Sequence, residues 1–204
     1  MTIANRPAAG WTPAVLLLSV ALAASPSVLA AAAAGWGVEQ LMQTFAAVKS
    51  SQARFVERKY LAILNAPLES SGTLVYVAPA RLEKHTLAPR AESLVLDGED
   101  VTITSTEPSQ RRTLNLQDYP PIRAFVESIR STLAGDLATL TRFYRVELVG
   151  SEHKWRLTLK PSEPEMQEVV REIRISGESG SINAIEIMET NGDRSVMTIT
   201  GNGS

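Results

Sequence analysis

The feature that most constrains the fold is a series of short alternating segments joined by tight turns. Segment 92–97 (ESLVLD) leads through Asp97-Gly98 into segment 99–105 (EDVTITS), and Asp-Gly is a hairpin signal because glycine readily adopts positive φ. In segment 153–160 (HKWRLTLK) apolar and polar residues alternate, as expected of a strand with one buried face. Strands joined by such short turns must pair in an antiparallel manner.

The same pattern continues along most of the chain and predicts about ten or eleven strands. Besides the three segments above, strands are expected at 52–64, 73–77, 81–87, 111–116, 145–149, 169–176, 182–189 and 194–201. The sequence shows neither an internal repeat nor a low-complexity linker. A single sheet is therefore the simplest arrangement for these strands.

Two segments show helical spacing of apolar residues instead. The first, 38–50, repeats Leu41, Phe45 and Val48 on one face. The second, 122–135, follows a proline pair and ends at a glycine, and a weaker helical piece follows over 136–144. The stripe of the second helix consists of Ile122, Phe125, Val126, Ile129 and Leu133. The elements together predict an α+β fold, in which a strongly curved antiparallel sheet carries helices over one face.

Residues 1–34 predict a cleavable signal peptide. Arg6 precedes the apolar run 14–24 (AVLLLSVALAA), and small residues suited to signal peptidase follow that run. The run is about half of the roughly 20 residues needed to span a bilayer, which favours cleavage over an uncleaved anchor. We expect the cut between residues 30 and 34, leaving one domain over 35–204 in the periplasm. The absence of cysteine excludes a lipoprotein and a disulfide framework.

Charge and motifs argue against several functions. The formal net charge of −2 at pH 7 does not suggest a nucleic-acid partner. The two histidines, His85 and His153, lack metal-site spacing, and neither a GxSxG elbow nor a glycine-rich phosphate loop occurs. The arginine pairs 54/58 and 111/112 could hold an anionic headgroup, although such residues more often keep a strand face soluble. We therefore expect no enzyme, no cofactor and no metal.

Three segments, in this order along the chain, resemble the LolA-type family of periplasmic lipoprotein carriers. Segment 45–58 (FAAVKSSQARFVER) is similar to that family's helix-to-first-strand junction. Segment 70–86 (SSGTLVYVAPARLEKHT) is similar to its Gly-x-Leu strand, proline turn and return strand, and segment 93–103 (SLVLDGEDVTI) to the following hairpin. Each match alone is weak, and together they are moderately specific for about the first third of the predicted mature chain.

The resemblance implies an unclosed half-barrel sheet whose concave, apolar side is covered by helices acting as a lid. It further implies a carrier that takes acyl chains of a lipoprotein from an inner-membrane transporter and passes them to an outer-membrane acceptor. A cavity can hold an acyl chain without covalent chemistry, because each buried CH₂ contributes roughly 0.8 kcal/mol. We expect a monomer whose partners are a lipoprotein or other lipid cargo, with no nucleic acid.

The candidate cavity residues are large apolar side chains on the expected inner face of the sheet and on the lid helix. Plain packing between sheet and helix is the alternative interpretation for each of them. They are Phe55, Leu74, Tyr76, Leu82, Leu94, Leu96, Ile103, Leu114, Leu116, Trp155 and Leu157 from the sheet, and Ile122, Phe125 and Ile129 from the helix.

The sequence also departs from the family pattern in two places. Ala78 stands where the carriers typically have an arginine that ties the sheet to the lid. Lys84 stands where a tryptophan is common, and segment 100–104 (DVTIT) lacks the aromatic residues expected after the Asp-Gly turn. We interpret the chain as a divergent member whose lid is held mainly by apolar contact and whose cargo could be another lipid, such as a glycolipid or an acylated pigment. The alternative function is a periplasmic lipid-sensing or protein-interaction domain of the same fold.

Overall fold

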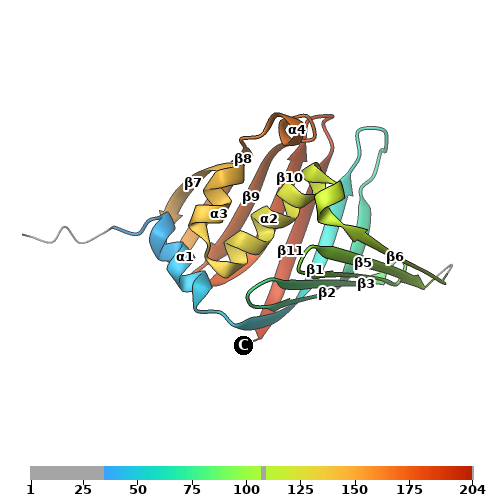
Figure 1. The fold of residues 1–204 in the computed structure, drawn as a ribbon, viewed down its shortest axis with the longest axis horizontal. Helices are drawn as coiled ribbons and strands as arrows, with labels where there is room; N and C mark the ends of the chain where they lie inside the picture. Colours follow the sequence, from blue (N-terminus) through green and yellow to red (C-terminus); the bar gives the residue numbers. More distant parts are fainter. Residues whose placement is uncertain (1–34, 107–108, 204) are drawn as a thin grey trace, which may run out of the picture. The chain divides into compact units, whose positions relative to one another are not determined.

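An eleven-stranded antiparallel sheet forms most of the protein (Figure 1). The computed structural model describes residues 35–106 and 109–203, all within a unit that spans Ala34–Ser204. The predicted signal peptide and its cleavage site, between residues 30 and 34, lie outside the described residues. Among the described residues, no helix is both long enough and apolar enough to cross a membrane.

The strands follow the order β6-β5-β4-β3-β2-β1-β11-β10-β9-β8-β7 across the sheet. Successive strands of the chain are neighbours, and the pairing of β1 with β11 joins the two halves. In the described part of the chain β6 and β7 are the two edges, so the sheet is open, as predicted. The strands are β1 Ser50–Tyr60, β2 Leu68–Val77, β3 Arg81–Ala88, β4 Glu92–Asp97, β5 Asp100–Thr106, β6 Ser109–Asn115, β7 Tyr144–Ser151, β8 Lys154–Pro161, β9 Val170–Glu178, β10 Ser181–Glu189 and β11 Arg194–Gly203.

Helices α1, α2 and α3 lie over one face of this sheet (Figure 1). The 3-10 turn η1 directly precedes α2, and the short α4, which had no signal in the sequence, lies between β8 and β9. The helices are α1 Val38–Ala46, the 3-10 turn η1 Leu116–Asp118, α2 Pro120–Ala134, α3 Leu137–Phe143 and α4 Pro164–Gln167. The predicted α+β class, with a curved antiparallel sheet covered by helices, is confirmed.

Two glycines end elements where the sequence predicts an end. Gly98 has φ +60° in the turn between β4 and β5, where a side chain would be strained. Gly135 has φ +69°, and its N–H donates to carbonyls of the last turn of α2. Two predicted ends are wrong: the first helix ends at Ala46 rather than at residue 50, because β1 begins at Ser50, and the first strand ends at Tyr60 rather than at residue 64, because the chain turns there before β2.

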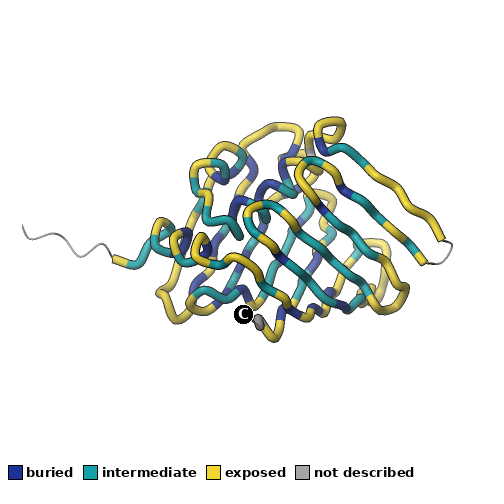
Figure 2. Tube along the Cα trace, turned by 60° about the horizontal axis from the view of Figure 1, so that its bottom comes forward, coloured by how far each residue is buried: buried dark blue, intermediate teal, exposed yellow. Residues whose placement is uncertain are grey.

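The main core lies between α1, α3 and the half of the sheet that ends at β7 (Figure 2). Phe45 of α1 meets Trp155 of β8 edge to face, with ring centroids 5.6 Å apart. Trp155 also donates a hydrogen bond from Nε1 to the Ser179 carbonyl at 2.9 Å. Tyr144 donates from its hydroxyl to the Ala124 carbonyl at 3.1 Å, and burial raises the pKa of Tyr144 to about 12. This half of the sheet is a filled interior.

Candidate functional site

A cavity of about 740 Å³ lies between helix α2 and the concave face of the sheet. Its walls come mainly from β1 to β5, from β9 to β11 and from α2, and most of the side chains are aliphatic. The volume falls within the range of about 300–1,000 Å³ that is usual for small-molecule sites. The cavity therefore lies over the middle strands of the sheet and over β2 to β5, whereas the end of the sheet at β7 and β8 is filled.

One row of cross-strand partners closes the cavity at one end. Tyr76, Leu82, Leu96 and Val101 are consecutive partners across β2, β3, β4 and β5. Tyr76, Leu96 and Val101 are only 3%, 2% and 5% exposed. The buried Tyr76 hydroxyl has no hydrogen-bond partner among the described residues, and burial raises the pKa of Tyr76. Apart from Ser51 of β1, which pairs with Tyr76 and also lines the cavity, this end is apolar and shielded from solvent.

The inner face becomes polar along the strands away from this row. The next row contains Leu74, Lys84, Leu94 and Ile103, so one lysine stands among three aliphatic side chains. The third row contains Gly72 of β2, Thr86 of β3 and Glu92 of β4. The cavity thus has an apolar closed end and a polar boundary on the same sheet face.

Helix α2 covers the cavity with the apolar stripe that the sequence predicts. Phe125, Ile129 and Leu133 are partly buried and line the cavity. Ile122 also lines it but is 44% exposed. The helix therefore covers this half of the sheet only in part.

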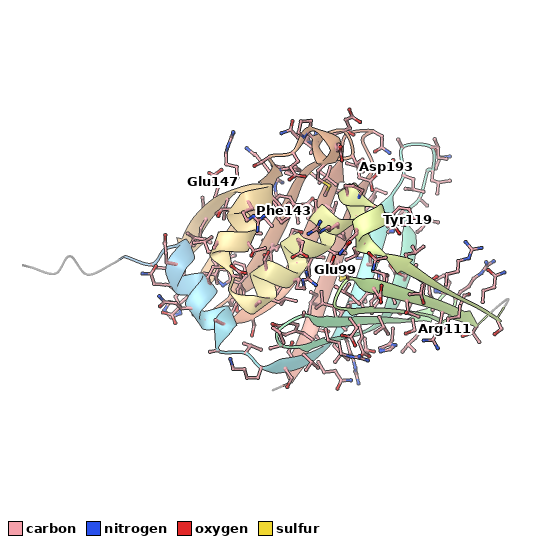
Figure 3. All side chains as sticks on the ribbon, viewed as in Figure 1. Glu99, Arg111, Tyr119, Phe143, Glu147 and Asp193 are labelled. Carbon is pink, nitrogen blue, oxygen red and sulfur yellow. The ribbon has the colours of Figure 1, made fainter. Side chains whose placement is uncertain are left out.

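Polar contacts add to the apolar ones that hold α2, and the expectation drawn from Ala78 did not include them. Arg130 of α2 donates from Nη1 to the Gly98 carbonyl at 2.8 Å and lies 3.5 Å from a Glu99 carboxylate oxygen through Nη2. Arg123 Nε, about two turns earlier on the same face of α2, lies 3.9 Å from the other Glu99 oxygen. Figure 3 shows Glu99 beside α2. The arginine that links the helix to the sheet is therefore Arg130 on α2, and it contacts the β4–β5 turn.

A buried ion pair lies at the polar boundary of the cavity. Glu57 on β1 is 5% exposed, and its carboxylate accepts hydrogen bonds from Lys84 Nζ at 2.5 Å and from Ser195 Oγ at 2.6 Å. Burial alone would raise the pKa of Glu57, but the hydrogen bonds and the charges of Lys84 and Lys59 outweigh burial and lower it. The carboxylate is therefore held in its charged form.

Glycine in the Gly-x-Leu segment makes room for this arrangement. A Cβ on Gly72 would lie 1.9 Å from the His85 carbonyl oxygen and 3.0 Å from the Phe55 ring. Lys84 extends over that same ring, with Nζ 5.0 Å from the ring centroid. A residue with a side chain at position 72 would displace β3 or the ring on which Lys84 rests.

The structure separates the fourteen predicted cavity residues into two groups. Eight of them line the cavity: Leu74, Tyr76, Leu82, Leu94, Leu96, Ile122, Phe125 and Ile129. The other six lie elsewhere on the inner face or in packed interior: Phe55, Ile103, Leu114, Leu116, Trp155 and Leu157. Trp155 and Leu157 belong to the main core, because α1 and α3 fill the space above them.

Sequence reasoning missed the contribution of the last strands. Ile185 and Ile187 of β10 and Met197 and Ile199 of β11 line the cavity opposite the predicted residues. Their alternation is visible in the sequence. They reach the site because β11 pairs with β1, and these two strands lie far apart in the sequence. Val126 of α2 and the ion pair of Glu57 with Lys84 were also missed. The available signal for the ion pair was a charged residue at an inward-facing position of a strand.

The remaining polar candidates lie away from the cavity. His85 contacts Glu83 at 2.8 Å and Ser93 at 3.1 Å on the opposite sheet face, and His153 is exposed. Arg111 lies far along β6 from the helices (Figure 3), and Arg58 pairs with Glu69 at the surface. In the part of the chain that the structure describes, no group of three or more acidic or histidine side chains could hold a metal ion.

Comparison with protein families gives a match over nearly the whole chain. The family described as outer membrane lipoprotein carrier protein LolA-like matches residues 30–204. A search of curated proteins finds no match.

Solved structures with a related arrangement are similar at low sequence identity. A LolA superfamily protein from Nitrosomonas europaea is 10% identical, with a TM-score of 0.45, and the match covers 82% of this chain and 93% of that one. A domain described as an outer membrane lipoprotein-sorting protein, from Vibrio parahaemolyticus, is 8% identical with a TM-score of 0.45, covering 81% and 90%. LprF from Mycobacterium bovis is 8% identical with a TM-score of 0.37, covering 82% and 93%.

Proposed function

We infer the function from one premise: the chain belongs to the LolA-like family of outer membrane lipoprotein carrier proteins. We propose that it is a periplasmic carrier that binds acyl chains of a lipoprotein or related lipid beneath α2. In this proposal it receives its cargo from an inner-membrane transporter and delivers it to an outer-membrane acceptor. The proposal depends chiefly on the aliphatic cavity of about 740 Å³, which one partly exposed helix covers.

The proposed task needs binding and release but no chemical step. An acyl chain moved from water into an apolar cavity gains roughly 0.8 kcal/mol for each buried CH₂. The cavity walls supply apolar surface for this transfer, and the half-buried side chains along β2, β3 and β4 leave that surface within reach of a guest. A binding protein therefore needs no catalytic group at this site.

Extraction of the purified protein with organic solvent, followed by mass spectrometry, tests the proposal. We expect an acylated amphiphile at close to one equivalent per wild-type chain. Leu82→Glu, in the cavity wall, should lose this lipid, while Arg111→Glu, on the exposed part of β6, should retain it. Absence of lipid from the wild-type extract, together with failure to take up an added acyl probe, would refute a carrier.

The proposed location has its own test. Protein recovered from the periplasm should begin between Ala31 and Gly35, which intact-mass analysis can measure. A chain that retains Met1 and stays in the membrane fraction would contradict the shuttle, because a tethered protein cannot cross between membranes.

A further inference from the structure

Three polar side chains from distant parts of the sequence meet inside the apolar cavity. Glu57 of β1 accepts from Lys84 of β3 at 2.5 Å and from Ser195 of β11 at 2.6 Å. Glu57, Lys84 and Ser195 all line the cavity. We call these three residues the polar cluster.

The polar cluster has hydrogen-bonding capacity to spare. An ammonium has three N–H donors. The Lys84 ammonium donates one hydrogen bond to a described residue, Glu57. Its side chain is 29% exposed and rests over the Phe55 ring. Glu57 thus fixes the position of Lys84 while the other donors of the ammonium remain available to a molecule in the cavity.

Packing alone gives no reason for an ion pair here. Taking two charges out of water is costly, and apolar side chains of similar size commonly stabilise a fold as well or better. The cross-strand neighbours of Lys84 are Leu74 and Leu94, which offer only apolar contact. A charge retained among such neighbours points to a role in binding.

The position of the polar cluster matches the shape of an amphiphile. On one side lies the closed row of Tyr76, Leu82 and Leu96, and on the other lie Thr86 and the exposed Lys59. A molecule whose hydrocarbon tail occupies the closed row would place its polar end at the ammonium. Lys59, which also lines the cavity, adds a second positive charge near that end.

We propose that Lys84, held in place by Glu57 and Ser195, is a head-group subsite that donates to a carboxylate or carbonyl oxygen at the head of a bound acyl chain. The tail then lies along the closed row, against Tyr76, Leu82 and Leu96. The inference rests on the proposed carrier function and adds the class and orientation of the cargo. That cargo is an acyl carboxylate, ester or amide, and a plain hydrocarbon lacks the group that Lys84 recognises.

Displacement of the uncharged fluorophore N-phenyl-1-naphthylamine by three probes with the same tail tests the subsite. The probes are lauric acid, methyl laurate and dodecane, which present a carboxylate, an ester and no polar group. The main variant combines Lys84→Met with Glu57→Gln, so that no uncompensated charge is left buried. Lys154→Met makes the same lysine substitution at an exposed position on β8, outside the cavity lining, and serves as the matched control.

We expect the double variant to bind lauric acid, methyl laurate or both about tenfold more weakly, as for loss of a charge-assisted hydrogen bond, with dodecane binding unchanged. Loss for lauric acid alone would assign a carboxylate, and loss for methyl laurate an ester or amide carbonyl. Equal changes for all three probes, or no change for any, would overturn the subsite while leaving the carrier proposal intact. If no probe displaces the fluorophore from the wild-type protein, the carrier proposal fails, and the subsite fails with it.

Discussion

Apolar and polar residues alternate in the same way in the two halves of the sheet, but the inward-facing apolar residues differ in how far they are buried. In the half from β7 to β9, Leu157, Leu159 and Ile173 are fully buried, at 0% exposure. In the half from β2 to β5, Leu82 and Leu94 occupy equivalent inward positions but remain partly exposed. Buried residues recur along β8 and β9, whereas intermediate burial, teal in Figure 2, predominates along β2 to β4. The inward face is therefore interior in one half and cavity wall in the other.

The helices account for the difference. Helices α1 and α3 place Leu41 and Leu140 onto the end of the sheet at β7 and β8, which is filled. Helix α2 packs on the main core through Ala124 and extends over β2 to β5, where Arg130 ties it to the β4–β5 turn. An apolar strand face therefore indicates only that it is shielded from water, and either a helix or a bound ligand can shield it.

The largest effect expected from this comparison is on stability. Leu157→Ala should lower the free energy of unfolding of the empty protein by about 2–5 kcal/mol, because it opens a new cavity in filled interior. Leu82→Ala removes the same atoms beside an existing cavity and should cost about 1 kcal/mol. Chemical denaturation measures both. Equal losses would mean that the two halves are packed alike.

Leu82→Glu should impair loading more than folding. The side chain faces the cavity, so its carboxylate can remain hydrated in the empty protein, whereas a bound acyl chain would bury it at a cost of about 2–3 kcal/mol. Lipid occupancy after purification and thermal melting of the empty protein are the two measurements. Unchanged occupancy together with an unchanged melting temperature would show that this part of the wall does not meet the cargo.

Phe125→Ala tests whether cargo and lid compete for the same apolar surface. Because Phe125 is only partly buried, we expect a loss of about 1–2 kcal/mol in the empty protein, less than the roughly 3–5 kcal/mol for a fully buried phenylalanine. The loaded form should be less affected, since cargo displaces the stripe.

Hydrogen exchange over residues 122–134, with and without restored lipid, follows the lid directly. Loading should lower the protection of α2, while β8 in the filled half should keep its protection and act as an internal control. Equal or greater protection of α2 on loading would count against a displaced lid.

The smallest effect is a pH dependence in the polar cluster. The pKa of Glu57 is lowered in the folded protein, so its stabilising contribution is present above its ordinary pKa of about 4.3 and is lost as pH falls through the folded value. Glu57→Gln should flatten the dependence of the melting temperature on pH below about 5. Glu147→Gln, at an exposed site on the edge strand β7 (Figure 3), should leave it unchanged. An unaltered profile for Glu57→Gln would show that the ion pair does not contribute.

Much of the fold was predictable from local signals. The ends of α2 were visible at the proline pair and Gly135, and the hairpin at Asp97-Gly98 set the register of β4 on β5. This register put Leu94 and Leu96 on one face with Ile103 and Val101. The brief α4 was not predictable, because one turn of helix is too short to show a period.

The site was only partly predictable, for a different reason. Inward positions such as Leu82 and Leu157 are identical in pattern, and whether one lines a cavity depends on helices from elsewhere in the chain. The tie through Arg130 was missed because its partners lie 31 and 32 positions away in sequence. Contacts of this kind leave no periodic signal in either segment.

The sequence by itself determined the antiparallel strands, their inward and outward faces, the lid helix and the family to which the chain belongs. Those properties follow from turn chemistry and from side-chain alternation, both of which act over a few residues. Only the tertiary structure decided that α1 and α3 fill the end of the sheet at β7 and β8, while space remains between α2 and the other strands. It also decided that Glu57, Lys84 and Ser195 meet, because the pairing of β1 with both β2 and β11 brings distant polar positions to one point in an apolar wall.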